Sequence, residues 1–176
     1  MKTPLLLSLV GCLGPAESIT KIGGHVLVDT RGQAGADATA IGGRHGLQFG
    51  AAVYGRQLTR EGDPNRYLGF GGDVLLRTSV IGLFSPDDHT LEHWFDFGAE
   101  AGAGGGAAYP TRFIAEGHGY AGAWVDIGLW TGDAYPALEL AVRREVEGSP
   151  WNDQTLFSIG VSWVHRTKVG AFTLRD

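Results

Sequence analysis

Residues 113–130, FIAEGHGYAGAWVDIGLW, read as two interleaved sequences. The odd-numbered positions carry only apolar or small side chains, whereas the even-numbered positions carry the carboxylates and the imidazole, at Glu116, His118 and Asp126. Successive side chains of a strand point to opposite faces, so a period of two predicts a β-strand with one apolar and one charged face. The segment is much longer than the roughly five or six residues usual in soluble sheets.

The same alternation recurs along nearly the whole chain, and no segment shows a convincing period of 3.6 residues. The 29 glycines also oppose helices, because each costs about 1 kcal/mol relative to alanine in a helix. The sequence therefore predicts an all-β protein. The alternating blocks are residues 19–31, 41–58, 66–80, 91–106, 113–130, 135–147 and 154–166.

Short polar connectors separate these blocks, at residues 60–65, 85–90, 109–111, 131–134 and 148–152. Short connectors require antiparallel neighbours, because parallel strands need long crossovers. A weaker block from Val169 to Leu174 would close the sheet against the first strand, and closure removes the exposed edges. The predicted fold is a single up-and-down antiparallel β-barrel of eight strands.

Alternation alone does not show which face is outside, since soluble carrier barrels are apolar inside and membrane barrels are apolar outside. Several blocks reach the roughly 9 to 11 residues that a tilted strand needs to cross the hydrocarbon of a bilayer. The polar face mixes opposite charges, as a narrow lumen requires, because unpaired buried charges are costly. We therefore predict a transmembrane barrel whose salt-bridged lumen contains Arg44, Arg56, Asp73, Arg77, Asp96, Glu100, Glu116, His118, Asp126, Glu139, Arg143 and Glu145.

The apolar face keeps charges away from the middle of each block and places Phe70, Phe95, Phe113 and Trp163 where interfacial girdles form. On this architecture, residues 19–174 resemble the small bacterial outer-membrane β-barrels of the OmpA/OmpX type. The resemblance implies a location in the outer membrane of a Gram-negative-type bacterium. Members of that class commonly end in a closing strand with an aromatic last residue; this chain ends otherwise, and residues 158–163 resemble that signal one strand early.

The N-terminal residues 1–16 resemble an export signal, because Lys2 precedes an apolar stretch too short to cross a bilayer as a helix. Residues 9–12 resemble a bacterial lipobox, which makes Cys12 a lipidation candidate, whereas residues 14–16 offer an ordinary cleavage site. Residues 17–176 then form the barrel domain. Cys12 is the only cysteine, so no disulfide is expected.

Nucleic-acid binding, metal binding and cofactor binding find little support in the sequence. The formal net charge is −5 and there is no basic run. The histidines His25, His45, His93 and His165 lack the close spacing of a zinc site. The glycine-rich residues 98–106 precede no predicted helix, so close packing explains them better than a phosphate cradle.

Catalysis is also not predicted, although the polar face carries suitable groups. His118 with Glu116 offers acid–base chemistry, and Ser158 or Ser162 offers a nucleophile, which makes a lipid hydrolase conceivable. However, these groups point inward, whereas a membrane-embedded substrate would lie outside.

The sequence thus predicts a non-enzymatic outer-membrane barrel with a structural, anchoring or partner-binding role. Lipid surrounds it, and any protein partner would bind the loops near residues 60–65, 83–90 and 107–112 or the opposite turns. Two alternatives remain: a soluble periplasmic lipocalin-like barrel carrying a small apolar ligand, and the lipid hydrolase. Solute flow is not expected, because large side chains such as Tyr120 and Trp124 can fill an eight-stranded lumen.

Overall fold

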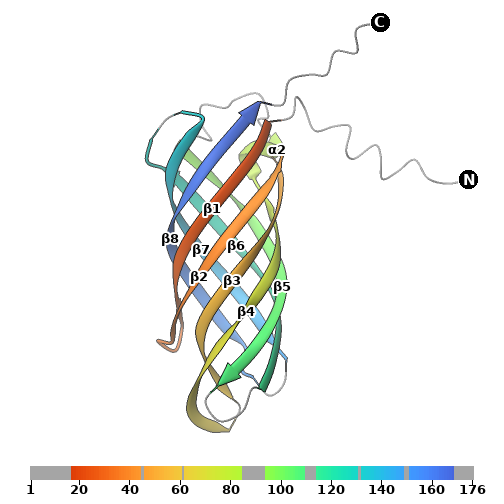
Figure 1. The fold of residues 1–176 in the computed structure, drawn as a ribbon, viewed down its shortest axis with the longest axis vertical. Coiled ribbons are helices and arrows are strands. Elements are labelled where there is room, and N and C mark those ends of the chain that lie inside the picture. Colours follow the sequence, from red (N-terminus) through yellow and green to blue (C-terminus); the bar gives the residue numbers. More distant parts are fainter. Residues whose placement is uncertain are drawn as a thin grey trace, which may run out of the picture.

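In the computed structural model, eight antiparallel strands form one closed barrel, in the order in which they follow one another in the chain (Figure 1). The strands are β1 (Glu17–Asp29), β2 (Ala34–Arg44), β3 (Leu47–Arg60), β4 (Asp63–Thr78), β5 (Phe95–Tyr109), β6 (Ile114–Gly128), β7 (Ala134–Glu147) and β8 (Gln154–Lys168), with a short helix α2 (Val80–Phe84) between β4 and β5. The structure describes residues 17–44, 46–60, 62–84, 94–109, 114–130, 132–148 and 151–168. The predicted fold class is confirmed.

The barrel closes where β1 pairs with β8, from Glu17 opposite Lys168 to Asp29 opposite Leu156. Every strand has 11 residues or more, enough to cross the hydrocarbon of a bilayer when tilted. The start of β1 and the end of β8 lie together with α2 at the upper end in Figure 1. The β3–β4 turn lies at the opposite, lower end.

One strand prediction was wrong in detail, and another lies outside the described residues. The block predicted at residues 41–58 is divided by a turn, because β2 ends at Arg44 and β3 begins at Leu47. Most of β2 was not predicted. Its outward positions between Ala34 and Ala40, which are every second residue, are all alanine and give a weak apolar signal. The predicted strand at residues 169–174 lies outside the described residues, and β8 already takes the closing position against β1.

The sequence does not predict helix α2, because the alternation extends the preceding block to Val80. The Ser79 side chain accepts a hydrogen bond from the Gly82 backbone N–H at 2.9 Å, which is N-capping geometry and marks the end of β4. Among the described residues, no helix is both long enough and apolar enough to cross a membrane.

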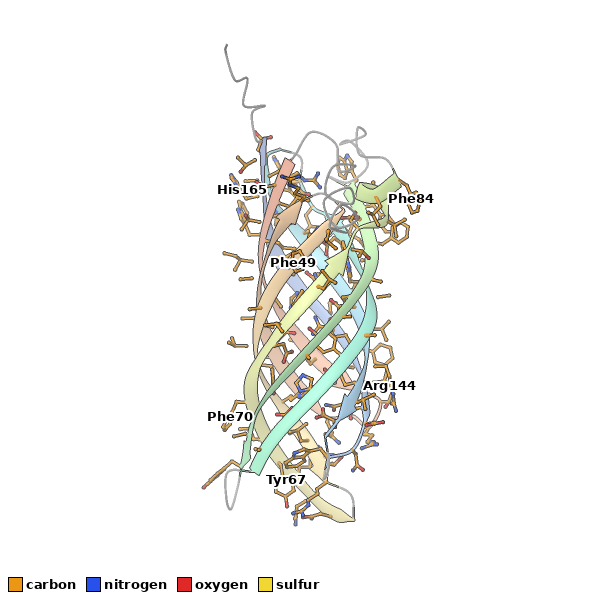
Figure 2. The ribbon with its side chains drawn as sticks, turned by 90° about the vertical axis from the view of Figure 1, so that its right-hand side faces the viewer. Phe49, Tyr67, Phe70, Phe84, Arg144 and His165 are labelled. Atoms are coloured by element: carbon orange, nitrogen blue, oxygen red, sulfur yellow. The ribbon has the colours of Figure 1, made fainter. Side chains whose placement is uncertain are left out.

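The outer surface is apolar and the inner surface is charged. Phe95, Phe97 and Ile127 are exposed, at 46%, 39% and 38% respectively, whereas Arg77 and Glu139 are fully buried. Figure 2 shows exposed aromatic side chains toward both ends of the barrel, Phe84 near the upper end and Phe70 near the lower end. This is the polarity of a membrane barrel, so the lipocalin-like alternative with an oily interior is wrong.

The glycine-rich segment of β5 provides close packing, as predicted. A Cβ atom on Gly102 would lie 2.4 Å from the Tyr120 ring, and one on Gly104 would lie 1.9 Å from the Asp73 carboxylate. These glycines therefore leave lumen space that the large side chains of neighbouring strands fill.

Candidate functional site

The inward-facing positions of the strands build a continuous charged lumen. Of the predicted lumen residues, all but Arg44 face the lumen: Asp126 is half-buried, and Arg56, Asp73, Arg77, Asp96, Glu100, Glu116, His118, Glu139, Arg143 and Glu145 are buried. Arg44 is exposed. Its cross-strand partner is the outward-facing Leu47, and paired residues share a face, so the turn between β2 and β3 places Arg44 outside the lumen.

The middle of the lumen contains a chain of ion pairs that we call the central network. Arg77 contacts Glu100 at 2.7 Å and Glu139 at 2.5 Å. Arg143 contacts the other oxygen of Glu100 at 2.5 Å and reaches Asp37 at 3.2 Å. Glu100 is thus shared by two guanidinium groups, which is the type of compensation that a buried carboxylate needs.

Lys21 and His25 of β1 complete the central network. The Lys21 ammonium lies 2.6 Å from Asp126 and 2.5 Å from Glu139. The His25 ring contacts Asp37 at 2.5 Å and Glu139 at 3.2 Å. These contacts connect β1, β2, β6 and β7 across the lumen, so the network fixes strands that do not pair directly.

Aromatic rings fill the space beside these cations. Lys21 and Arg77 each lie 5.3 Å from the ring centroid of Trp124, and Arg143 lies 5.3 Å from that of Tyr120. Cation–π contacts of this kind add to the ion pairs when water is excluded.

Nearer the lower end, a second cluster, the lower network, gathers around Arg56 of β3. Arg56 contacts Glu145, Glu116 at 2.5 Å and Glu147 at 2.9 Å. Gln154 donates to Glu145 and Glu147 at 3.0 Å each. One arginine therefore compensates three carboxylates.

His118 and Asp73 extend the lower network. The two His118 ring nitrogens lie 3.1 Å from Asp73 and 3.2 Å from Glu116. The Tyr54 hydroxyl donates to Glu116 at 2.9 Å. The imidazole is held on both sides and is therefore a structural part of the lumen filling.

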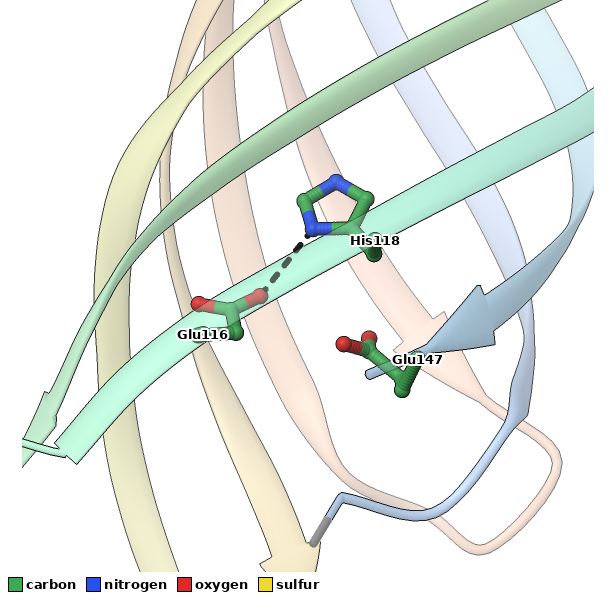
Figure 3. Close-up of side chains that lie close together, drawn as sticks. All are labelled: Glu116, His118 and Glu147. Carbon is green, nitrogen blue, oxygen red and sulfur yellow. Dashed lines mark ion pairs between the residues drawn. The ribbon is translucent and has the colours of Figure 1, made fainter. Parts of the chain in front are cut away.

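Glu116, His118 and Glu147 also form the arrangement that most resembles a metal site in the described part of the chain, since their ligand atoms lie within 4.8 Å of one another (Figure 3). However, Arg56 Nη2 lies 2.5 Å from Glu116 Oε1, 2.9 Å from Glu147 Oε1 and 3.1 Å from His118 Nδ1. The guanidinium occupies the space between the three side chains, so a metal ion could enter only by displacing Arg56.

Apolar clusters close the lumen above and below. At the upper end, Ile19, Tyr135, Ala137 and Val164 pack together. At the lower end, Leu58, Tyr67, Ala108 and Trp151 do so, with the Tyr67 and Trp151 rings edge to face at 5.3 Å.

Trp151 and Asn152, just before β8, contact other strands at the lower mouth of the barrel. Trp151 forms an isolated bridge with Arg60 of β3, and the Asn152 backbone N–H donates to the Thr59 carbonyl at 3.2 Å. The Trp151 indole donates to the Ala115 carbonyl of β6 at 3.1 Å. Trp151 is thereby held in the mouth by β3 from across the barrel and by β6, the neighbour of β7.

The candidate catalytic serines do not meet a base. Among the described residues, neither the Ser158 nor the Ser162 hydroxyl has a hydrogen-bond partner, and His118 is engaged with Asp73, Glu116 and Arg56. No nucleophile–base pair is therefore assembled within the described chain.

Four ion-pair members of the networks were missing from the predicted set: Lys21, His25, Asp37 and Glu147. In residues 19–31 the apolar Ile22, Val26 and Val28 alternate with Lys21 and His25, so the same signal is sufficient to identify both residues. Asp37 lies on the unpredicted strand β2, and Glu147 is the last residue of its block.

No protein-family model matches the sequence, and no curated protein matches it. Among solved structures, the chain is similar to Neisserial surface protein A, with 10% identity over 89% of this chain and 98% of that one and a TM-score of 0.46. It is also similar to Ail, the attachment invasion locus protein of Yersinia pestis, with 8% identity over 86% of this chain and 97% of that one and a TM-score of 0.44. Ail in complex with the heparin analogue sucrose octasulfate gives 10% identity, coverages of 86% and 99%, and a TM-score of 0.43.

Proposed function

We propose that this chain is a non-enzymatic outer-membrane β-barrel of a Gram-negative-type bacterium, with a structural, anchoring or partner-binding role. The observation that carries the proposal is the polarity of the wall, with exposed apolar side chains outside and paired charges inside. An isolated charge facing the bilayer midplane would cost about 2–4 kcal/mol. The exposed charged residues of the described strands, such as Arg44 and Arg144, lie toward the strand ends, whereas the charges at mid-strand face the lumen.

The filling of the lumen argues against a pore. Ion pairs span the middle, and apolar clusters stand at both ends. A cavity near the upper end, lined by Lys21, Asp96 and Asp126 among others, has a volume of about 20 Å³, which is about the space of one water molecule. The barrel therefore acts through its outer surface or its ends.

The lower end is the surface that we propose for a protein partner. The β3–β4 turn within the predicted loop at residues 60–65 lies at this end, and β5 ends there at Tyr109, the described part of the predicted loop at 107–112. Phe84 of the third predicted loop lies at the upper end. Arg60 and Arg66 are exposed beside the β3–β4 turn and Asp63 is half-buried within it, so the surface offers charged groups of both signs to a protein partner.

Membrane extraction and electrophoresis test this proposal. The protein should remain in the outer-membrane fraction after carbonate washing and dissolve only in detergent. The unheated barrel should also migrate faster in SDS gels than the heated chain, because the folded barrel is compact. Release by carbonate would contradict the proposal, as would steady conductance of the reconstituted protein in planar bilayers.

The export segment remains part of the proposal, since residues 1–16 lie outside the described residues. We propose that they direct export and that Cys12 is the lipidation candidate. The intact mass of the mature protein tests this: lipidation predicts a chain beginning at Cys12 with added acyl groups, whereas ordinary cleavage predicts an unmodified chain beginning after Ala16.

A further inference from the structure

A shallow groove of about 550 Å³ lies on the outer surface above β7. Leu140 and Val142 of β7 line it, Val28 of β1 and Phe157 of β8 stand on one side, and Ala123 of β6 stands on the other. The groove arises because bulky side chains on β8 and β1 face a β6 surface on which Ala121 and Ala123 are small.

Two arginines lie just below this groove. Arg144 follows Val142 on the same face of β7, about 7 Å farther along the strand. Its side chain is 59% exposed, and its guanidinium reaches Asp153 at 3.4 Å and Thr155 at 3.3 Å. Figure 2 shows Arg144 near the lower end of the barrel.

Arg31, in the β1–β2 turn, approaches the same place from the other side. Its guanidinium donates to the Asp153 carbonyl at 3.1 Å, and the Thr30 backbone N–H donates to the Thr155 carbonyl at 3.2 Å. Both exposed guanidinium groups thus contact Asp153, Arg144 through its carboxylate and Arg31 through its backbone carbonyl, so only one of the two positive charges is paired with this carboxylate. Exposed ion pairs contribute little, so this site keeps its attraction for an anion.

We propose that the groove binds one acyl chain of a phospholipid with an anionic headgroup, whose phosphate lies between Arg31 and Arg144. The inference rests on the proposed membrane-barrel function, because only then does hydrocarbon face the groove. The groove is apolar where acyl chains lie, and the arginines stand where a headgroup begins. Arginine binds phosphate oxygens in a bidentate manner, which suits this position.

Native mass spectrometry of the full chain, released from detergent with phosphatidylglycerol or phosphatidylcholine, tests the headgroup site. The wild type should retain one phosphatidylglycerol in preference to phosphatidylcholine. Each of Arg31→Gln and Arg144→Gln should weaken that preference about fivefold, as expected for one basic residue at an anionic surface. The matched control is Arg66→Gln, an exposed arginine near the same end on β4, which should change nothing.

A second pair of variants tests the groove itself. Ala123→Leu fills the groove and should reduce retention of both lipids, whereas Ala101→Leu on the outer face of β5 should not. Equal lipid retention by Ala123→Leu and the wild type would overturn the proposal. Equal loss of the phosphatidylglycerol preference in Arg66→Gln and Arg144→Gln would also overturn it. So would a dimer in the mass spectrum that Ala123→Leu abolishes, because a second copy would then occupy the groove. Because all variants are compared as folded, detergent-soluble barrels, these outcomes leave the membrane-barrel proposal itself intact.

Discussion

The two networks of the lumen differ in how many cations hold their carboxylates. In the central network, three lysine or arginine side chains and one histidine contact four carboxylates. The basic members are Lys21, Arg77, Arg143 and His25, and the carboxylates are Asp37, Glu100, Asp126 and Glu139. In the lower network, one arginine, Arg56, and one histidine, His118, contact four carboxylates: Asp73, Glu116, Glu145 and Glu147. The central network is therefore redundant, whereas the lower network depends on one side chain.

Replacing Arg56 should have the largest effect. Arg56→Met keeps the bulk of the side chain but leaves Glu116, Glu145 and Glu147 without their shared partner. Breaking a buried ion pair by removing one member costs about 3–5 kcal/mol. Urea unfolding of the barrel in lipid vesicles, followed by gel mobility, measures this loss. An unfolding midpoint equal to that of the wild type would show that the stability of the lower network does not depend on Arg56.

Replacing Arg77 should cost less, although Arg77 is the more deeply buried. In Arg77→Met, Glu100 keeps Arg143 and Glu139 keeps Lys21. We expect a loss of about 2 kcal/mol, the scale of a hydrogen bond to a charged group. The same unfolding assay compares the two variants directly. If Arg77→Met is as damaging as Arg56→Met, the redundancy of the central network is refuted.

Removing one carboxylate should partly repair the lower network. Adding Glu147→Gln to the Arg56→Met chain should recover about 1 kcal/mol, because fewer uncompensated charges remain and contacting residues are coupled. The single variant Glu147→Gln is the fourth protein needed for the double-mutant cycle. Strict additivity of the two changes would mean that Arg56 and Glu147 do not interact.

The smallest effect is expected at Arg44. Because Arg44 is exposed outside the lumen, Arg44→Gln should change the free energy of unfolding by no more than about 0.5 kcal/mol. This separates Arg44 from the lumen arginines in the same assay. A loss of unfolding free energy comparable with that of Arg77→Met would instead show that Arg44 belongs to the lumen network.

The sequence predicted the barrel and most lumen residues because alternation determines the face of each side chain once a strand is continuous. It failed at Arg44, where the unrecognised turn before Leu47 reversed which positions face inward. Because this turn was not recognised, Arg44 was predicted to face the lumen although it lies outside it.

The ion-pair partners were a different matter. Arg56 and Glu145 are separated by 89 residues and face each other only because the barrel closes with a particular register and tilt. Alternation carries no information about that closure, so the division into two networks could not be predicted. The same limit applies to Trp151, whose segment showed only turn residues in the sequence.

The central claim is that the alternating wall faces hydrocarbon outside and paired charges inside. Spin labelling tests it most directly: a nitroxide attached to Val53→Cys, in a Cys12→Ser chain reconstituted in vesicles, reports its surroundings through collisions with dissolved oxygen or a water-soluble nickel chelate. Val53 is 64% exposed on the outer face of β3, so the label should collide with oxygen and be shielded from nickel. Strong collisions with nickel would place this face in water and contradict the account.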